Sequence, residues 1–295
     1  MIIRQHGFTL VEMSIVLIII GLVVAGILVG QDMISASTIR MQIAQIDKYN
    51  SAVHTFQSKY GGLPGDITAA TASQLGFAAR GTYPGEGDGN GLIEGITNAA
   101  GAHNGAAETA GETLMFWVDL SQANLIDATL SAGSATTIPG LPINTTAVLS
   151  TYFPAARMGN SNSVYVFSGG YGNGNIGTNN DGNNYFDVAV ITSLQNTWKM
   201  YTSPGMIVAQ AFNIDSKIDD GFPMSGTVLA LTNNGGFIPW VNPSYPVTGP
   251  PYTSGVGATS STCYDNAGQG GHVQKYSTTQ SQGSGINCAL SFKFQ

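Results

Sequence analysis

Oxygen-bearing side chains recur at alternate positions in the run Glu86–Glu94, which reads EGDGNGLIE. Carboxylate and amide oxygens that alternate with glycine, followed by an isoleucine, are typical of the front of an EF-hand-like calcium loop. The match ends at Thr97, which stands where such a loop has its bidentate glutamate, and no clear helix precedes the run. Two interpretations stay open, a calcium site and a glycine-rich turn with solvated carboxylates. In the first, the ligands come from Glu86, Asp88, Asn90 and Glu94.

A second group of acidic residues, Asp215, Asp219 and Asp220, falls at the expected end of a helix. Aspartates are unfavourable there because the helix dipole places partial negative charge at the C-terminus. A cation, the nearby Lys217 or the N–H groups of a backbone turn could each compensate for this charge. The group is therefore a second candidate metal site.

Hydrolytic catalysis finds little support in the sequence. Neither a G-x-S-x-G nor an H-E-x-x-H motif occurs. Paired Asp and Glu residues occur in the head, but nothing in their sequence spacing favours a glycosidase. His103 and His272 are expected in exposed loops. His6 belongs to the leader, and His54 lies on the predicted long helix. We therefore do not expect an enzyme.

Composition narrows the partners and the class of protein. The net charge is −7 and only 9% of the residues are charged, so nucleic acid is not expected as a partner. Hydrophobic residues make up 43% of the chain, which argues against intrinsic disorder.

A single charge interrupts the apolar segment Phe8–Gly30, and it is the carboxylate of Glu12. The segment has the length of about 20 residues that a transmembrane helix needs. Arg4 before it and Asp32 after it place the leader in the cytoplasm and the rest of the chain outside. A carboxylate within a bilayer costs a few kcal/mol and usually has a partner. Glu12 is expected either to lie near the interface, where it reaches the polar region or is protonated, or to meet a cation in another copy of the chain.

The polar leader Met1–Gly7 provides a source for that cation. A charged leader before an apolar run also begins a secretory signal peptide, but no clear small-residue cleavage site follows this run. Cleavage between Gly7 and Phe8 would instead create an α-amino group close to Glu12. Within one straight helix the amine cannot easily curl back, whereas a neighbour shifted along its axis could present it. This arrangement predicts lengthwise polymerisation.

The residues from Gly7 to Met13, which read GFTLVEM, resemble the processing site of type IV pilins and of the pseudopilins of type II secretion. The resemblance covers roughly the first sixty residues. It implies that a prepilin peptidase cuts after Gly7 and methylates Phe8, and that Glu12 registers each subunit on the next. The implied partners are other copies, other pilins or pseudopilins, and an inner-membrane assembly platform. The helix-bending proline common in pilins is absent; in its place stand Gly21, Gly26 and Gly30.

Beyond the apolar segment, the sequence predicts that one helix continues to Tyr60, giving a helix over residues 8–60. Apolar residues recur at steps of three or four and form one face, and Gly61-Gly62 followed by Leu63-Pro64 is a strong stop. Such a helix is on the order of 80 Å long. Its first half, residues 8–30, would lie in the membrane or the filament core, and its second half would pack on a head. The face consists of Ile39, Ile43, Ile46, Tyr49, Val53, Phe56 and Tyr60.

The remaining residues, 61–295, are expected to form a globular head outside the cytoplasm. A helix is predicted over Glu108–Leu125, and a second helix begins at Ser203-Pro204 and ends at Gly221, with Ile207, Ala211, Ile214 and Ile218 on its inner face. Loops are predicted over 131–142 and 169–184, and strands over 163–168, 185–193, 227–232 and 289–294. This order of elements predicts an α+β fold, a long N-terminal helix packed on a large antiparallel sheet.

Two cysteines, Cys263 and Cys288, stand near the C-terminus. An even pair outside the cytoplasm suggests a disulfide, which would stabilise the head by about 3 kcal/mol on the loop-entropy model. A redox or metal-binding thiol pair is the alternative, but neither a C-x-x-C motif nor a nearby histidine cluster is present. The resemblance to pilins, which often close a C-terminal loop with a disulfide, favours the structural interpretation.

The sequence thus predicts a structural, pilin-like subunit. The precursor would cross the inner membrane once, and the mature protein would lie in a cell-surface pilus or a periplasmic pseudopilus. A head of this size favours a minor or tip subunit. The alternative is an adhesin, or another ligand-binding head, that uses the helix mainly for display.

Overall fold

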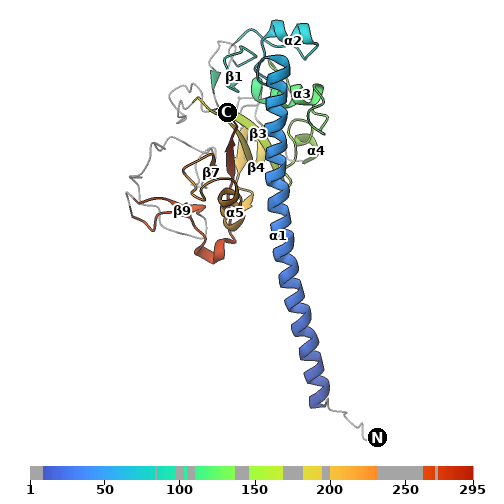
Figure 1. Cartoon of the computed structure of the whole chain (residues 1–295), viewed down its shortest axis with the longest axis vertical. Helices are drawn as coiled ribbons and strands as arrows, with labels where there is room; N and C mark the ends of the chain where they lie inside the picture. Colours follow the sequence, from blue (N-terminus) through green and yellow to red (C-terminus); the bar gives the residue numbers. More distant parts are fainter. Residues whose placement is uncertain are drawn as a thin grey trace.

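The computed structural model describes residues 9–83, 85–96, 103–104, 110–136, 146–168, 182–194, 200–230, 262–269 and 272–294. Several predicted features lie outside these ranges. They are the leader with Gly7 and Phe8, Thr97, the first residues of the helix predicted from Glu108, half of the loop predicted over 131–142 and most of the loop predicted over 169–184. The structure confirms the expected α+β class, with one long helix beside a mostly antiparallel head (Figure 1).

Helix α1, Leu10–Tyr60, is a single element of 51 residues. Thr9 caps its N-terminus, and Gly61 ends it in the left-handed conformation with φ of 80°. Glycine adopts that conformation without a steric penalty, which explains the stop at the Gly61-Gly62 pair. The helix is about 75 Å long, and its N-terminal part projects well beyond the head (Figure 1).

The predicted apolar face of α1 is the face that packs on the head. Its residues are buried except for Ile43 and Tyr60, which are half-buried and pack against the same core. The N-terminal part of α1 is exposed and is long and apolar enough to cross a membrane, judged by length and composition.

The central sheet has the strand order β3-β4-β11-β7, and every described pair in it is antiparallel. Strand β5 pairs with the end of β4. The four predicted strands are confirmed as β3, β4, β7 and β11, with ends that agree to within two residues, and β5 is a further strand that was not predicted. The strands are β3 Asn162–Ser168, β4 Asn184–Leu194, β5 Met200–Ser203, β7 Val228–Ala230 and β11 Leu290–Lys293.

Helix α3, Glu112–Gln122, packs between α1 and the sheet. The Trp117 ring lies 5.0 Å from that of Tyr49 on α1 and 6.2 Å from that of Phe186 on β4, measured between ring centroids. The helix begins at Glu112, after Gly111 with φ of 82°. Trp117 of α3 therefore connects α1 to the central sheet.

Helix α5, Val208–Ile218, begins later than predicted, so the Ser203-Pro204 start is wrong. Ser203 ends β5, and the next residues form β6, Met206–Ile207, which pairs with β10, Ile286–Cys288. Pairing with β10 keeps this backbone extended and delays the helix. Ala211 and Ile214 are buried as predicted, whereas Ile207 lies in the strand and Ile218 is 38% exposed.

The shorter elements complete the description of the head. They are α2 Ala69–Leu75, β1 Gly95–Ile96 paired with β2 His103–Asn104, α4 Thr146–Leu149, β8 Tyr264–Asp265 paired with β9 Lys275–Tyr276, and η1 Gln280–Gly283. His272 is exposed as predicted, whereas His103 belongs to β2 and not to a loop.

Candidate functional site

The N-terminus of α1 holds Glu12 in a capping box with Thr9. Oε2 of Glu12 accepts hydrogen bonds from the backbone N–H of Thr9 at 2.7 Å and from its hydroxyl at 2.8 Å. The backbone N–H of Glu12 in turn donates to Oγ1 of Thr9 at 3.2 Å. Such reciprocal bonds satisfy donors that the first helical turn leaves free. The carboxylate therefore points toward the end of the helix where cleavage would create the new amine.

The loop predicted to bind calcium wraps around two buried carboxylates from other segments, Asp66 and Glu112. Asp66 accepts hydrogen bonds from the backbone N–H groups of Gly89, Asn90 and Gly91, at 2.8 to 3.1 Å. Glu112 accepts from the N–H groups of Gly87, Asp88 and Glu94, at 2.9 to 3.3 Å. Six backbone donors from one loop thus converge on two carboxylates.

Glycine at position 87 is required by this close packing. Gly87 has φ of 102°, and a Cβ there would lie 2.7 Å from the carbonyl oxygen of Ile67. Both the backbone angle and the contact exclude a side chain. Glycine at this position therefore has a structural cause in the wrapping of the loop around Asp66 and Glu112.

The predicted calcium ligands are only partly brought together. Oε2 of Glu86 accepts from the backbone N–H of Tyr83, and Oε2 of Glu94 accepts from the side-chain amide of Asn90. Carboxylate oxygens of Asp66, Asp88 and Glu112 instead lie within 4.8 Å of one another and could hold a cation. Calcium at this loop stays a prediction, with Asp66 and Glu112 as candidate ligands that the sequence interpretation missed.

Burial perturbs the protonation of both missed carboxylates. Burial raises the pKa of Asp66 to about 7, and the neighbouring Asp88 carboxylate adds to this rise. Burial also raises the pKa of Glu112 well above its ordinary value, with a further contribution from Asp66. The buried Arg80 does not neutralise them, because its guanidinium pairs with Asp119 at 2.6 Å. A bound cation or a proton would relieve this charge repulsion.

The second acidic group is held by the turn that follows α5. Asp215 accepts from the N–H of Gly221 at 3.0 Å, and Asp219 accepts from the N–H of Val228 at 3.1 Å. Asp220 accepts from the N–H of Phe222 at 2.8 Å. These bonds supply one of the three expected compensations, the N–H groups of a backbone turn. The three carboxylates also lie within 4.8 Å of one another, so a cation there stays a prediction.

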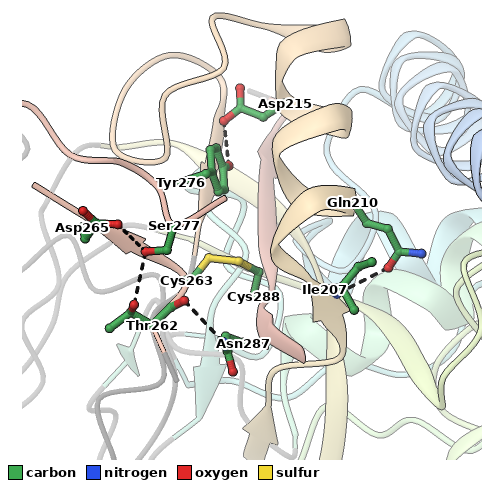
Figure 2. The surroundings of a disulfide bond; sticks show 10 residues. All are labelled: Ile207, Gln210, Asp215, Thr262, Cys263, Asp265, Tyr276, Ser277, Asn287 and Cys288. Atoms are coloured by element: carbon green, nitrogen blue, oxygen red, sulfur yellow. Dashed lines mark hydrogen bonds between the residues drawn. A yellow bond between two sulfur atoms is a disulfide. The ribbon is translucent and has the colours of Figure 1, made fainter. Parts of the chain in front are cut away.

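The segment beside this turn is closed by a disulfide between Cys263 and Cys288, with a Cα–Cα distance of 5.0 Å (Figure 2). This is the pairing expected from the two cysteines. Both cysteines are fully buried. Tyr276, within the closed segment, donates its hydroxyl hydrogen bond to Asp215 on α5 at 2.7 Å (Figure 2). The disulfide and this bond together fasten the C-terminal part of the head to α5.

Comparison with protein families matches residues 2–28 to the prokaryotic N-terminal methylation motif. The chain thus carries the prepilin-type signal of type IV pilins and pseudopilins. The match contains Gly7, Phe8 and Glu12, and it ends within the exposed apolar part of α1. Comparison with curated proteins and with solved structures gives no match. The head therefore has to be interpreted from its own geometry.

Proposed function

We propose that this protein is a structural subunit of a type IV pilus or of a type II secretion pseudopilus. The observation that carries the proposal is the methylation motif at residues 2–28, which is continuous with a 51-residue helix whose apolar N-terminal part has no partner within the described chain. Exposed apolar surface of this extent needs either lipid or other subunits. An inner-membrane precursor that later assembles meets both needs in turn.

Maturation would remove Met1–Gly7 and leave Phe8 as the new N-terminus, methylated by the same prepilin peptidase. The new amine would lie four residues before Glu12, whose carboxylate points toward that end of α1. In a neighbour shifted along the helix axis, the amine would replace Thr9 as the partner of Glu12. An inner-membrane assembly platform would move the mature subunit from the bilayer into the filament.

The head supports the assignment to a minor or tip subunit, because a head built from residues 61–295 is bulky to repeat along a whole fibre. The described part of the head lies beside the C-terminal half of α1, and the apolar N-terminal half extends beyond it (Figure 1). The same arrangement fits a pilus on the cell surface and a pseudopilus in the periplasm. Location therefore has to be measured.

Shearing of host cells, followed by detection with an antibody to residues beyond Gly61, tests the proposal. Mature protein is expected in sheared filaments for a pilus subunit. For a pseudopilin it is expected in the envelope, with loss of secreted enzymes on deletion. Glu12→Ala should abolish assembly in either case, because it removes the carboxylate that a neighbour's amine would bind. Ser14→Ala is a matched control, since this hydroxyl donates to the carbonyl oxygen of Val11 within its own helix.

Normal assembly of the Glu12→Ala variant would contradict the proposed role of the helix. Binding of the detergent-solubilised full chain to a glycan array would then favour the adhesin, in which α1 only displays the head.

A further inference from the structure

The exposed apolar surface of α1 does not end where a membrane would end. Met13, Ile20, Ile27, Ile34 and Met41 recur every seven residues and are all exposed, Ile34 at 69% and Met41 at 47%. Met13 and Met41 are about 42 Å apart along the helix, whereas the hydrocarbon core of a bilayer is about 30 Å thick. The upper end of this stripe is therefore in water in the precursor. A seven-residue repeat is the spacing at which one helix packs along another.

Two opposite charges lie beside the upper end of the stripe. Arg40 and Asp47 are seven residues apart and therefore lie above one another on one side of α1. Both are exposed, and within the described part of the chain neither side chain forms an ion pair or a hydrogen bond. Lys48, the next residue, is different, because it pairs with Asp127 of the head. Arg40 and Asp47 are thus charges without an intramolecular role.

One axial shift between two copies of α1 brings both Arg40 close to Asp47 and the amine of Phe8 close to Glu12. If the amine of Phe8 in one copy lies level with Glu12 of its neighbour, the two helices are offset by four residues, about 6 Å. That offset brings Arg40 of the raised copy to within three residues, about 4.5 Å along the axis, of Asp47 in the lower copy. The long arginine side chain can cover this difference.

We propose that Arg40 of one copy pairs with Asp47 of a second copy of this chain, while Ile34 and Met41 extend the helix contact above the membrane segment. This inference rests on the proposed assembly through α1. Charge complementarity between the two exposed side chains selects a second copy as the partner. The pair would add a second register point about 50 Å along the helix from Glu12.

Charge reversal in the native host tests the pair, with sheared filament or pseudopilus yield as the readout. Arg40→Asp and Asp47→Arg should each lower the yield about tenfold, because like charges then face each other. The double variant R40D/D47R restores the pair and should return the yield to about the wild-type level. Lys48→Ala is the control, an exposed cation on the same helix whose partner is intramolecular. Assembly failure of Glu12→Ala with normal yields from both single reversals would overturn this inference and leave the proposed function standing.

Cysteine crosslinking identifies the partner. A chain with Arg40→Cys and Asp47→Cys is expected to form disulfide-linked dimers and longer ladders on oxidation of whole cells. A chain with Arg40→Cys and Gln57→Cys should not form the corresponding 40–57 crosslink, because in the proposed register position 40 of the raised copy and position 57 of the lower copy are about 20 Å apart along the axis. Absence of the 40–47 crosslink, or a crosslink only to a different protein, would overturn the pairing between copies. Normal filaments from Glu12→Ala would instead contradict the proposed function itself.

Discussion

The hydroxyl of Tyr276 lies 2.7 Å from Oδ2 of Asp215, and this bond connects the disulfide-closed segment to the last turn of α5. Asp215 is fully buried, and burial raises the pKa of its carboxyl to about 7. The Tyr276 hydroxyl opposes that rise by donating to the carboxylate. One side-chain pair thus links the C-terminal segment to the acidic turn that follows α5.

Removal of this hydroxyl should destabilise the head. Tyr276→Phe leaves a buried carboxylate without its side-chain donor, and we expect the free energy of unfolding to fall by about 1–3 kcal/mol. Chemical denaturation of the full chain in detergent measures the loss. Tyr83→Phe is the matched control, because the Tyr83 side chain is 44% exposed. Equal stability of both variants would show that the Tyr276–Asp215 bond contributes nothing.

The disulfide should contribute to stability through the unfolded chain. Cys263 and Cys288 are 25 residues apart, and closure of such a loop stabilises by about 3 kcal/mol on the chain-entropy model. Cys263→Ser should lower the unfolding midpoint under oxidising conditions, and added reductant should lower the wild type to a similar value. A midpoint that responds neither to the substitution nor to reductant would contradict this prediction.

The buried Asp187 should make the head more stable at mildly acidic pH. It lies on β4 and accepts a hydrogen bond from the hydroxyl of Tyr165, but burial dominates and raises the pKa of Asp187 from 3.8 to about 7. Between those values the folded chain holds a proton that the unfolded chain has lost, so stability falls as the pH rises. The slope for one group is at most about 1.4 kcal/mol per pH unit, and it ends above about pH 7.

Asp187→Asn should flatten this dependence, because the substituted side chain does not titrate. Denaturation of the full chain at pH 5 and at pH 8 measures the difference, with Asp220→Asn as an exposed control. An identical pH dependence in wild type and Asp187→Asn would assign the effect to other buried carboxylates, such as Asp66.

Local periodicity explains why much of the fold could be predicted. The spacing of residues such as Ile39, Ile46 and Val53 matches the helical repeat, and all three are buried on the predicted face. The strands around Val166 and Phe186 were identified from their apolar, β-branched composition. These signals lie within a few residues of one another, so the sequence shows them directly.

Contacts between distant segments explain the errors. Ser203-Pro204 has the chemistry of a helix start, yet the following residues pair with β10, about eighty residues further along. The sequence does not indicate Asp66 and Glu112 as candidate ligands, because the loop residues that they contact lie 18 to 25 residues away. The local signals were present, an aspartate just after the helix stop and an acid in the first turn of α3, but they did not indicate a shared partner.

Calcium should stabilise the head if Asp66, Asp88 and Glu112 bind it. At a calcium concentration of about 100 times its Kd, the free energy of unfolding should rise by about 2.7 kcal/mol, and EGTA should reverse the gain. The gain should shrink at pH 5, because protons compete for Asp66, whose pKa is about 7. Glu112→Gln should remove the response, whereas Asp220→Asn, in the second acidic group, should keep it. A melting temperature that is independent of calcium would favour the glycine-rich turn.

Processing should depend on the small residue before the predicted cut. The resemblance implies a cut directly after Gly7, so the bulkier valine of Gly7→Val should leave the precursor uncleaved and its helix anchored in the membrane. Mass spectrometry of the N-terminus provides the measurement. We expect methylated Phe8 in the wild type and an N-terminus within the leader in the variant. Gln5→Val is the control, because it introduces the same side chain two residues before Gly7. A wild-type protein that retains Met1 after assembly would contradict the processing step and, with it, the supply of the amine that Glu12 would bind.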